Sequence, residues 1–226
     1  MVSPFDPSID QLPAVLPIFP LPGALLLPQG TLPLNVFEPR YLAMINAALK
    51  TDTRLIGMIQ PADPEGKPGP NNLCRVGCAG RISNFSETDD GRYVLQLTGV
   101  IRFAIEREID METGYRRVFP DYDRFCKDLT ATPEIGDIDR VALMEATKAY
   151  FEANSYDTDW EALEKTSALT LVTSLSMACP FDVMEKQALL EAENHVERAA
   201  VLTSLLRMGA ASGHRSDDSD SETSLN

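Results

Sequence analysis

The sequence predicts an α+β fold in which a strand-rich N-terminal domain is followed by a C-terminal helical bundle. Short apolar runs separated by Pro and Gly turns fill residues 15–125, which is typical of a coiled or barrel-type sheet. After Thr132-Pro133 the apolar residues recur with helical spacing. Thirteen of the sixteen prolines fall within the first 70 residues, so the two halves also differ in composition.

Nine short apolar runs are the candidate strands of the first domain. They are Val15–Phe19, Leu25–Leu27, Leu32–Phe37, Leu55–Ile59, Cys74–Cys78, Arg81–Phe85, Tyr93–Leu97, Ile101–Ile105 and Tyr115–Phe119. Asp89, Asp90 and Gly91 stand between two of these runs and predict a hairpin turn. The segment 63–72 is rich in Pro, Gly and Asn and is expected to be a surface loop.

One helix is expected to interrupt the strands at residue 39. Pro39 suits the first turn of a helix, and the preceding Glu38 complements the helix dipole. An apolar stripe then follows at Tyr41, Met44, Ile45, Ala48 and Leu49.

The second half is expected to hold four helices, near 138–153, 159–178, 182–193 and 195–208. Asp182 with Glu185, and Asn194 with Glu197, are plausible helix starts, and Gly209 is expected to end the last helix. We therefore divide the chain into a flexible leader (1–12), a β domain (13–129), a helical bundle (130–209) and a disordered acidic tail (210–226).

The uncharged stretch of residues 14–37 has the length of a membrane span but not its chemistry. It contains five prolines, and each interior proline costs a helix about 3 kcal/mol. A secretory signal would need an early basic residue, yet the first one is Arg40. We expect a cytoplasmic protein without a targeting segment.

The charge balance argues against anionic partners. The net charge is −14, and residues 1–129 contribute only −3 of it, whereas residues 130–209 contribute −8. Phosphate backbones and anionic lipids repel such a chain, so no nucleic-acid or membrane partner is expected.

The four cysteines do not predict a metal site or a disulfide. Cys74 and Cys78 are the only close pair, and on a strand their sulfurs would stand about 13 Å apart. We therefore expect separate thiols, no metal and no cofactor.

The common catalytic motifs are absent from the sequence. Gly66-Lys67 is followed by Pro68 and so does not form a phosphate-binding loop, and neither Gly-x-Ser-x-Gly nor His-Glu-x-x-His occurs. His195 is expected on a helix face and His214 in the tail. No catalytic residue is predicted, although a site assembled from scattered residues, such as a Ser-Lys dyad, stays open.

Several motifs in a fixed order resemble the N-terminal domain of Lon proteases. The block starting at Leu16 reads LPIFPLPGALLLPQGTLPLNVFEPRY. It is followed by the matching segments Arg75–Ile82, Asp90–Tyr93, Leu97–Phe103 and the pair Arg116-Arg117. The later segments Glu185–Leu190 and Glu197–Leu206 resemble the helical part of stand-alone members, so the resemblance covers nearly the whole folded chain.

The resemblance implies a twisted, PUA-like β domain that recognises substrate polypeptide, without the ATPase and protease domains of full-length Lon. The expected partner is an unfolded or extended polypeptide, with a protease or chaperone as a further partner, and the oligomeric state stays open. The candidate binding residues are Phe37, Glu38, Arg40, Tyr41 and Arg81. The alternatives are a PUA-like RNA-binding protein and a small hydrolase.

Each of these motifs also has a purely structural interpretation. Glu38 and Pro39 are good helix-start residues in any protein, and Gly77, Gly80 and Gly99 allow bulges or close backbone approach in strands. Arg81 and Arg102 could pair with acids of the helical bundle or be solvated.

Overall fold

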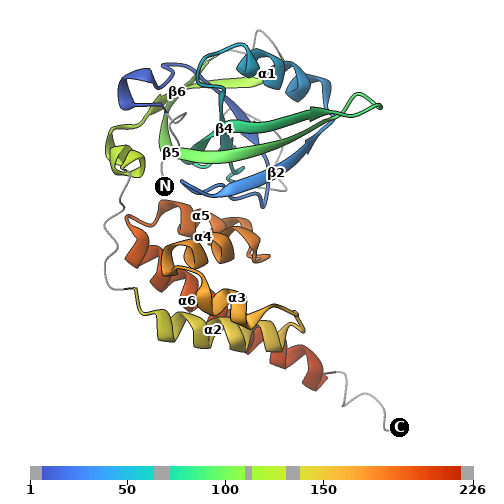
Figure 1. Ribbon diagram of the computed structural model, residues 1–226, viewed down its shortest axis with the longest axis vertical. Helices are drawn as coiled ribbons and strands as arrows, with labels where there is room; N and C mark the ends of the chain where they lie inside the picture. The colour runs from blue at the N-terminus through green and yellow to red at the C-terminus, as the bar shows by residue number, and fades with distance from the viewer. Residues whose placement is uncertain (1–6, 64–71, 110–113, 131–137, 220–226) are drawn as a thin grey trace. The chain divides into compact units, whose positions relative to one another are not determined.

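The computed structural model describes residues 7–63, 72–109, 114–130 and 138–219, with the side chains of 213–219 left aside. The chain divides into two compact units (Figure 1). The first unit comprises Met1–Pro133 together with Asp182–Leu190, and the second comprises Glu134–Phe181 together with Glu191–Asn226. The expected leader lies partly outside the described residues, and its described part forms one 3-10 turn, η1 (Ile9–Gln11).

A six-stranded mixed sheet forms the first unit. The strands are β1 (Leu16–Pro20), β2 (Thr31–Val36), β3 (Leu55–Ile59), β4 (Val76–Glu87), β5 (Tyr93–Ile109) and β6 (Arg116–Asp121). Their order is β2-β5-β4-β3-β1-β6, with β1 parallel to β3 and the other pairs antiparallel. Because β6 also pairs with β5, the hydrogen-bonded order β5-β4-β3-β1-β6 returns to β5.

The strands are fewer and longer than the apolar runs predict. The runs Arg81–Phe85 and Tyr93–Leu97 are parts of the long strands β4 and β5, whose register shifts near Gly80 and Ile82. These irregularities bend the strands without ending them, which is why the sequence shows broken runs. Leu25–Leu27 is a buried connection between β1 and β2 rather than a strand.

The hairpin and the early helix are confirmed. The β4–β5 turn has Gly91 at φ 78°, and the Thr88 N–H donates to the Arg92 carbonyl at 2.9 Å. Helix α1 (Pro39–Leu49) packs against β1 and β3 and buries Tyr41 and Met44 on its inner face. The predicted loop 63–72 lies largely outside the described residues, but its two ends meet, because the Asp63 N–H donates to Asn72 Oδ1 at 2.7 Å.

Two glycines make room for the largest core side chain of the sheet. Phe103 on β5 is fully buried. A Cβ on Gly57 or Gly77 would lie 2.8 or 2.6 Å from its ring, closer than atoms can approach. The close backbone approach predicted for Gly77 is therefore confirmed, and the core depends on these positions having no side chain.

Helix α5 (Val183–Glu191) provides most of a segment that belongs to the first unit, although the sequence assigned residues 182–193 to the helical bundle. Hydrogen bonds from side chains to backbone carbonyls attach α5 to the rest of the first unit. Lys186 Nζ donates to the Gly23 carbonyl at 2.6 Å, and Gln187 Nε2 donates to the Val76 carbonyl at 3.1 Å. From the sheet side, Gln60 Nε2 donates to the Val183 carbonyl at 3.1 Å. The helical spacing of apolar residues predicts that a helix forms, but it does not predict which domain the helix packs against.

Arg102 on β5 connects three elements of the first unit, namely β5, a 3-10 helix and α5. Its guanidinium forms two hydrogen bonds of 2.9 Å to Asp128, which lies in the 3-10 helix η2 (Asp123–Leu129), and stacks 4.8 Å over the Phe125 ring. It also donates to the Leu190 carbonyl at 3.1 Å. The expected ion pair with an acid of the bundle is therefore formed instead with an acid from the β half.

The second unit consists of α2 (Arg140–Ala153), α3 (Trp160–Lys165), α4 (Ala168–Ala178) and α6 (His195–Ser219). The predicted helix 159–178 is two helices, because Thr166 is extended and Ser167 caps α4 by accepting a hydrogen bond from the Thr170 N–H at 3.2 Å. A serine inside an apolar periodicity can thus start a new helix as well as continue one.

Gly209 does not end the last helix, because α6 continues to Ser219 and so includes residues 210–219, which were predicted to belong to the tail. Residues 220–226 lie outside the described part. A Cβ on Gly209 would lie 2.4 Å from the Tyr150 ring of α2, so this glycine allows two helices to approach closely. Among the described residues, no helix is long and apolar enough to cross a membrane.

Candidate functional site

The motif of residues 37–41 lies where β2 ends and α1 begins. The Glu38 carbonyl accepts the first helical hydrogen bonds, from the N–H groups of Tyr41 and Leu42 at 2.9 and 3.0 Å. Tyr41 is buried, and its ring packs 4.1 Å from that of Phe19 on β1. Tyr41 therefore anchors the helix in the core, while Glu38 and Arg40 remain at the surface.

Phe37 is the most exposed aromatic residue of the described first unit, with 65% of its surface accessible. Two further apolar side chains are exposed at this end of the sheet: Val94 on β5 at 45% and Phe85 on β4 at 37%. The register places Val94 opposite Asn35, two residues before Phe37. We call only Phe37 and Val94 the junction patch, because Phe85 pairs with Leu95 and therefore lies on the other face of the sheet.

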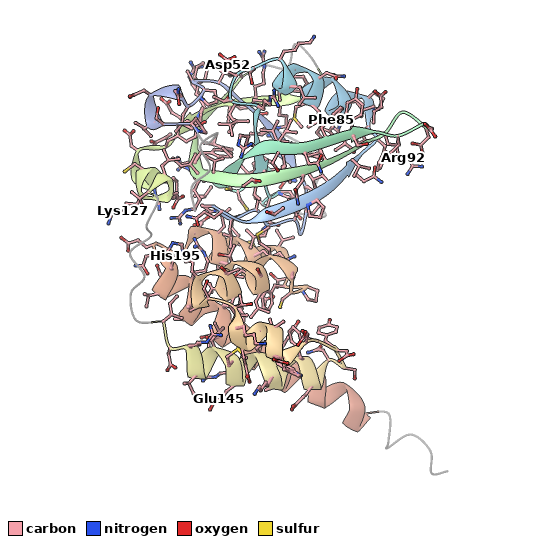
Figure 2. All side chains as sticks on the ribbon, in the orientation of Figure 1. Asp52, Phe85, Arg92, Lys127, Glu145 and His195 are labelled. Atoms are coloured by element: carbon pink, nitrogen blue, oxygen red, sulfur yellow. The ribbon has the colours of Figure 1, made fainter. Side chains whose placement is uncertain are left out.

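Side chains on the other face of the sheet join the hairpin to α1. The Phe85 ring meets that of Tyr93 edge-on at 4.9 Å, and the Tyr93 hydroxyl exchanges hydrogen bonds with the Asn46 side chain of α1 at 3.0 and 3.2 Å. Helix and hairpin are thus joined on the face opposite to the patch. Phe85 and the turn residue Arg92 are both labelled in Figure 2, on the hairpin formed by β4 and β5.

Charges beside the patch are paired. Glu38 accepts hydrogen bonds from Arg40 at 2.7 and 2.9 Å, and Asp90 forms an ion pair with Arg92 at 2.7 Å. A hydrogen bond from the Thr88 hydroxyl, aided by Arg92, lowers the pKa of Asp90. Burial raises the pKa of Tyr41, partly opposed by the Arg40 guanidinium 4.5 Å above its ring. The patch therefore presents apolar surface among charges that neutralise one another.

Arg81 lies elsewhere on the sheet. It stands on β4 opposite Thr98, and Thr98 pairs with Thr31 at the other end of β2 from Phe37. Val36 is five positions along the strand from Thr31, which corresponds to about 17 Å. The structure therefore brings together Phe37, Glu38, Arg40 and Tyr41, but not Arg81.

The edge of β2 is only partly suited to receiving another strand. The Gly99 N–H donates to the Gly30 carbonyl at 2.8 Å, so the alternation of the ladder turns the backbone groups of Thr31, Pro33 and Asn35 away from β5. Pro33 has no N–H to offer, which removes the central donor. An extended polypeptide lying on this edge would therefore depend on side-chain contacts for much of its affinity.

Sequence reasoning found Phe37 but missed Phe85 and Val94. Val94 falls on the face of β5 opposite to that of Leu95 and Leu97, among polar neighbours such as Gln96. An apolar residue on the polar face of an alternating strand is a usable indication of an exposed patch. Phe85 gives no such indication, because it shares the apolar face and is exposed only where the hairpin extends.

The described side chains form no group of three or more potential metal ligands. None of the four cysteines is in a disulfide; Cys126 is exposed and the other three are buried. His195 begins α6, where it is half-buried beside Arg198. The chemistry available at the junction patch is thus apolar contact and hydrogen bonding.

A protein-family model matches most of the chain. It describes the substrate-binding domain of ATP-dependent protease La (Lon) and aligns with residues 15–208. Among curated relatives, the Lon protease of Anaeromyxobacter dehalogenans is 34% identical over 107 residues, which is 47% of this chain and 12% of that protein. The Lon protease of Elusimicrobium minutum is 24% identical over 207 residues, which is 88% of this chain and 24% of that protein.

Two solved structures share the fold. The Lon N-terminal domain protein from Xanthomonas campestris has a TM-score of 0.57 at 23% identity, covering 84% of this chain and 97% of that one. The N-terminal domain of Mycobacterium avium complex Lon protease has a TM-score of 0.59 at 16% identity, covering 85% and 97%. This chain therefore spans a small part of the curated relatives but nearly the whole of these domain structures.

Proposed function

This chain belongs to the family of substrate-binding domains of ATP-dependent protease La (Lon), and on that premise we propose that it is a non-catalytic polypeptide-binding module acting in protein quality control. Its ligands are unfolded or extended segments, which it holds for a protease or chaperone. The family is that of the substrate-binding part of Lon rather than the protease part.

The observation that carries this proposal is the junction patch. A large aromatic side chain with 65% exposure is costly to leave in water, and burying it fully contributes about 1.5–3 kcal/mol. The ion pairs Glu38–Arg40 and Asp90–Arg92 leave little net charge beside it. Such a surface suits apolar side chains, which folded proteins hide and unfolded proteins expose.

The proposal includes a PUA-like, barrel-type architecture for the first unit. The pairing of β6 with both β1 and β5 supports it, since the strand order returns to its starting strand. A closed ring has few free edges, and β2 lies outside the ring with β5 as its partner. Phe37 of the junction patch therefore follows directly after the one strand of the sheet that is not part of the ring.

The test is fluorescence anisotropy of a labelled, permanently unfolded model protein titrated with this chain. The same protein in its native form and a single-stranded RNA serve as parallel ligands. We expect saturable binding of the unfolded form alone. Phe37→Ala should weaken it about tenfold, the equivalent of about 1.4 kcal/mol of lost apolar contact.

Met184→Ala is the matched control, because Met184 has similar exposure (60%) and lies on α5 of the same unit. It should leave binding unchanged. Equal losses in both variants would mean that exposed apolar residues act without a defined site. Binding of RNA with a steep salt dependence would favour the RNA-binding alternative instead, and no binding to any ligand would overturn the proposal.

A further inference from the structure

Five aromatic side chains gather at one end of the second unit. Tyr150 and Phe151 lie at the end of α2, Tyr156 in the turn that follows, Trp160 at the start of α3, and Phe181 after α4. The ring centroids of contacting pairs are 5.8 to 6.2 Å apart, within the range for favourable aromatic packing.

This aromatic group has a buried half and a surface half. Tyr150 and Phe181 are buried, and Tyr150 also contacts α6 at Gly209. Phe151 and Trp160 are half-buried, and Tyr156 is 44% exposed. The core of the unit explains the buried half but not the side chains that stand in water.

Local backbone geometry holds the surface half in place. Ser155 adopts a left-handed conformation (φ 55°), and the Tyr156 N–H donates to the Phe151 carbonyl at 2.9 Å. Asp159 caps α3 by accepting a hydrogen bond from the Ala162 N–H at 3.0 Å, which fixes the start of the helix at Trp160. Aromatic rings fixed in this way lose little conformational entropy when a ligand binds.

The surface around these rings is acidic. Residues 150–164 contain five acids and no base. Glu152 follows Phe151, Asp157 follows Tyr156, and Asp159 and Glu161 flank Trp160, and all four acids are exposed. We call Phe151, Tyr156, Trp160 and these four acids the acidic aromatic cluster.

A cation already approaches this cluster from within the chain. Lys148 Nζ lies 5.9 Å from the centre of the Trp160 ring and 3.8 Å from a carboxylate oxygen of Glu164. The Lys148 ammonium group thus lies near both the Trp160 ring and an acid of α3. Cation–π contact of this kind contributes about 0.5–1 kcal/mol at exposed sites.

We propose that the acidic aromatic cluster binds polypeptide segments in which Lys or Arg stands beside apolar residues. The rings receive the apolar side chains and the cations, and the four acids attract the positive charge. The proposal takes its class of ligand from the proposed function but places it on a second surface with a different preference. The junction patch has paired charges and selects apolar chain, whereas this cluster selects basic apolar chain.

Trp160 is the only tryptophan of the chain, so its fluorescence reports on this cluster directly. The experiment titrates the whole chain with a short peptide of equal numbers of leucine and lysine. Two control peptides replace lysine by glutamate or leucine by serine. We expect a saturable change in Trp160 emission with the leucine–lysine peptide alone, weakened as salt is raised.

Two variants test the two parts of the cluster. Tyr156→Ala and Asp157→Asn should each weaken binding of the leucine–lysine peptide by about three- to tenfold. Asp52→Asn makes the same charge change in the first unit, where Asp52 is exposed (Figure 2), and should leave binding unchanged. Circular dichroism of each variant checks that the helices are retained.

Several outcomes would overturn the proposal. They are equal binding of the glutamate peptide, an equal effect of Asp52→Asn, and peptide binding by anisotropy without any change in Trp160 emission. Phe37→Ala separates the two proposals, because it should weaken binding of the unfolded protein and leave the leucine–lysine peptide unaffected. If the chain binds the unfolded protein but not the leucine–lysine peptide, the proposal for the acidic aromatic cluster fails alone. If it binds the peptide but not the unfolded protein, the proposal for the junction patch fails alone.

Discussion

The two units are held together in different ways. In the first, segments far apart in the sequence are joined by buried side chains that bond to the backbone: Gln60, Lys186, Gln187 and Arg102 all connect the sheet with α5. In the second, side chains such as those of Asp159 and Ser167 form local helix caps, and the helices meet mainly through packing. When a segment packs against elements that are distant in sequence, directional hydrogen bonds specify a single packed position. Helices that are neighbours in sequence are positioned mainly by the complementary shapes of their packed side chains.

The largest expected effect is that of Arg102→Met, which tests the directional bonds of the first unit. It leaves the buried carboxylate of Asp128 without its bidentate partner, and breaking such a pair costs about 3–5 kcal/mol of unfolding free energy. Urea denaturation followed by far-UV circular dichroism measures the loss, and Trp160 fluorescence follows the second unit separately.

Arg92→Met is the matched control, since Arg92 forms an exposed ion pair with Asp90, and the denaturation midpoint should not move. The double variant Arg102→Met with Asp128→Leu should recover much of the loss, because no unpaired charge stays buried. If the single variant is as stable as the double, directional bonding is not what holds the first unit.

A smaller effect is expected from removing a glycine contact in the second unit. Replacing glycine by alanine in an open helix stabilises it by about 1 kcal/mol. At Gly209 the added methyl group would lie 2.4 Å from the Tyr150 ring, so Gly209→Ala should instead destabilise the protein, by about 1–3 kcal/mol. Thermal denaturation followed by Trp160 fluorescence gives the sign, and a rise in the midpoint would show that shape does not limit this helix pair.

The smallest expected effect near neutral pH is the dependence of the stability of the first unit on pH. Burial raises the pKa of Tyr41 and of Tyr122 above the value near 10 of an unfolded chain. A raised folded pKa means that the neutral phenol is favoured by the fold, so this stability is complete below about pH 10 and is lost as the pH rises through the folded values.

Urea midpoints measured by circular dichroism should therefore fall between about pH 8 and about pH 11. Tyr122→Phe should reduce this fall, at the cost of the hydrogen bond from the Tyr122 hydroxyl to the Pro13 carbonyl. A midpoint independent of pH, or an equal fall in the variant, would contradict the assignment to buried phenols.

Much of the fold can be predicted from local patterns. The span Leu55–Ile59, the hairpin at Gly91 and the helix after Pro39 match the structure, because each depends on neighbouring residues alone. What could not be predicted is long-range. Nothing within residues 182–193 indicates that their helix belongs with the sheet. In the sequence, a glycine that ends a helix, as predicted for Gly209, cannot be distinguished from one that allows two helices to pack closely.

The candidate site divides in the same way. The sequence marks Phe37, Glu38 and Arg40 as neighbours because they are adjacent in the chain. It cannot show that Val94 lies two positions along the ladder from Phe37, or that Arg81 is in register with the opposite end of β2, because both depend on strand pairing. The acidic aromatic cluster is recognisable in the sequence itself, since its acids and aromatic residues lie close together within residues 150–164.

The place of α5 in the first unit also sets an order of events during synthesis. All six strands have been made by residue 121, yet the carbonyl partners of Gln60 and of Arg102 on α5 come only with residues 183 and 190. Helices α2, α3 and α4 are translated in between. A nascent chain therefore carries an incomplete sheet unit while the second unit is being made, and the surface that later contacts α5 stays uncovered during this interval.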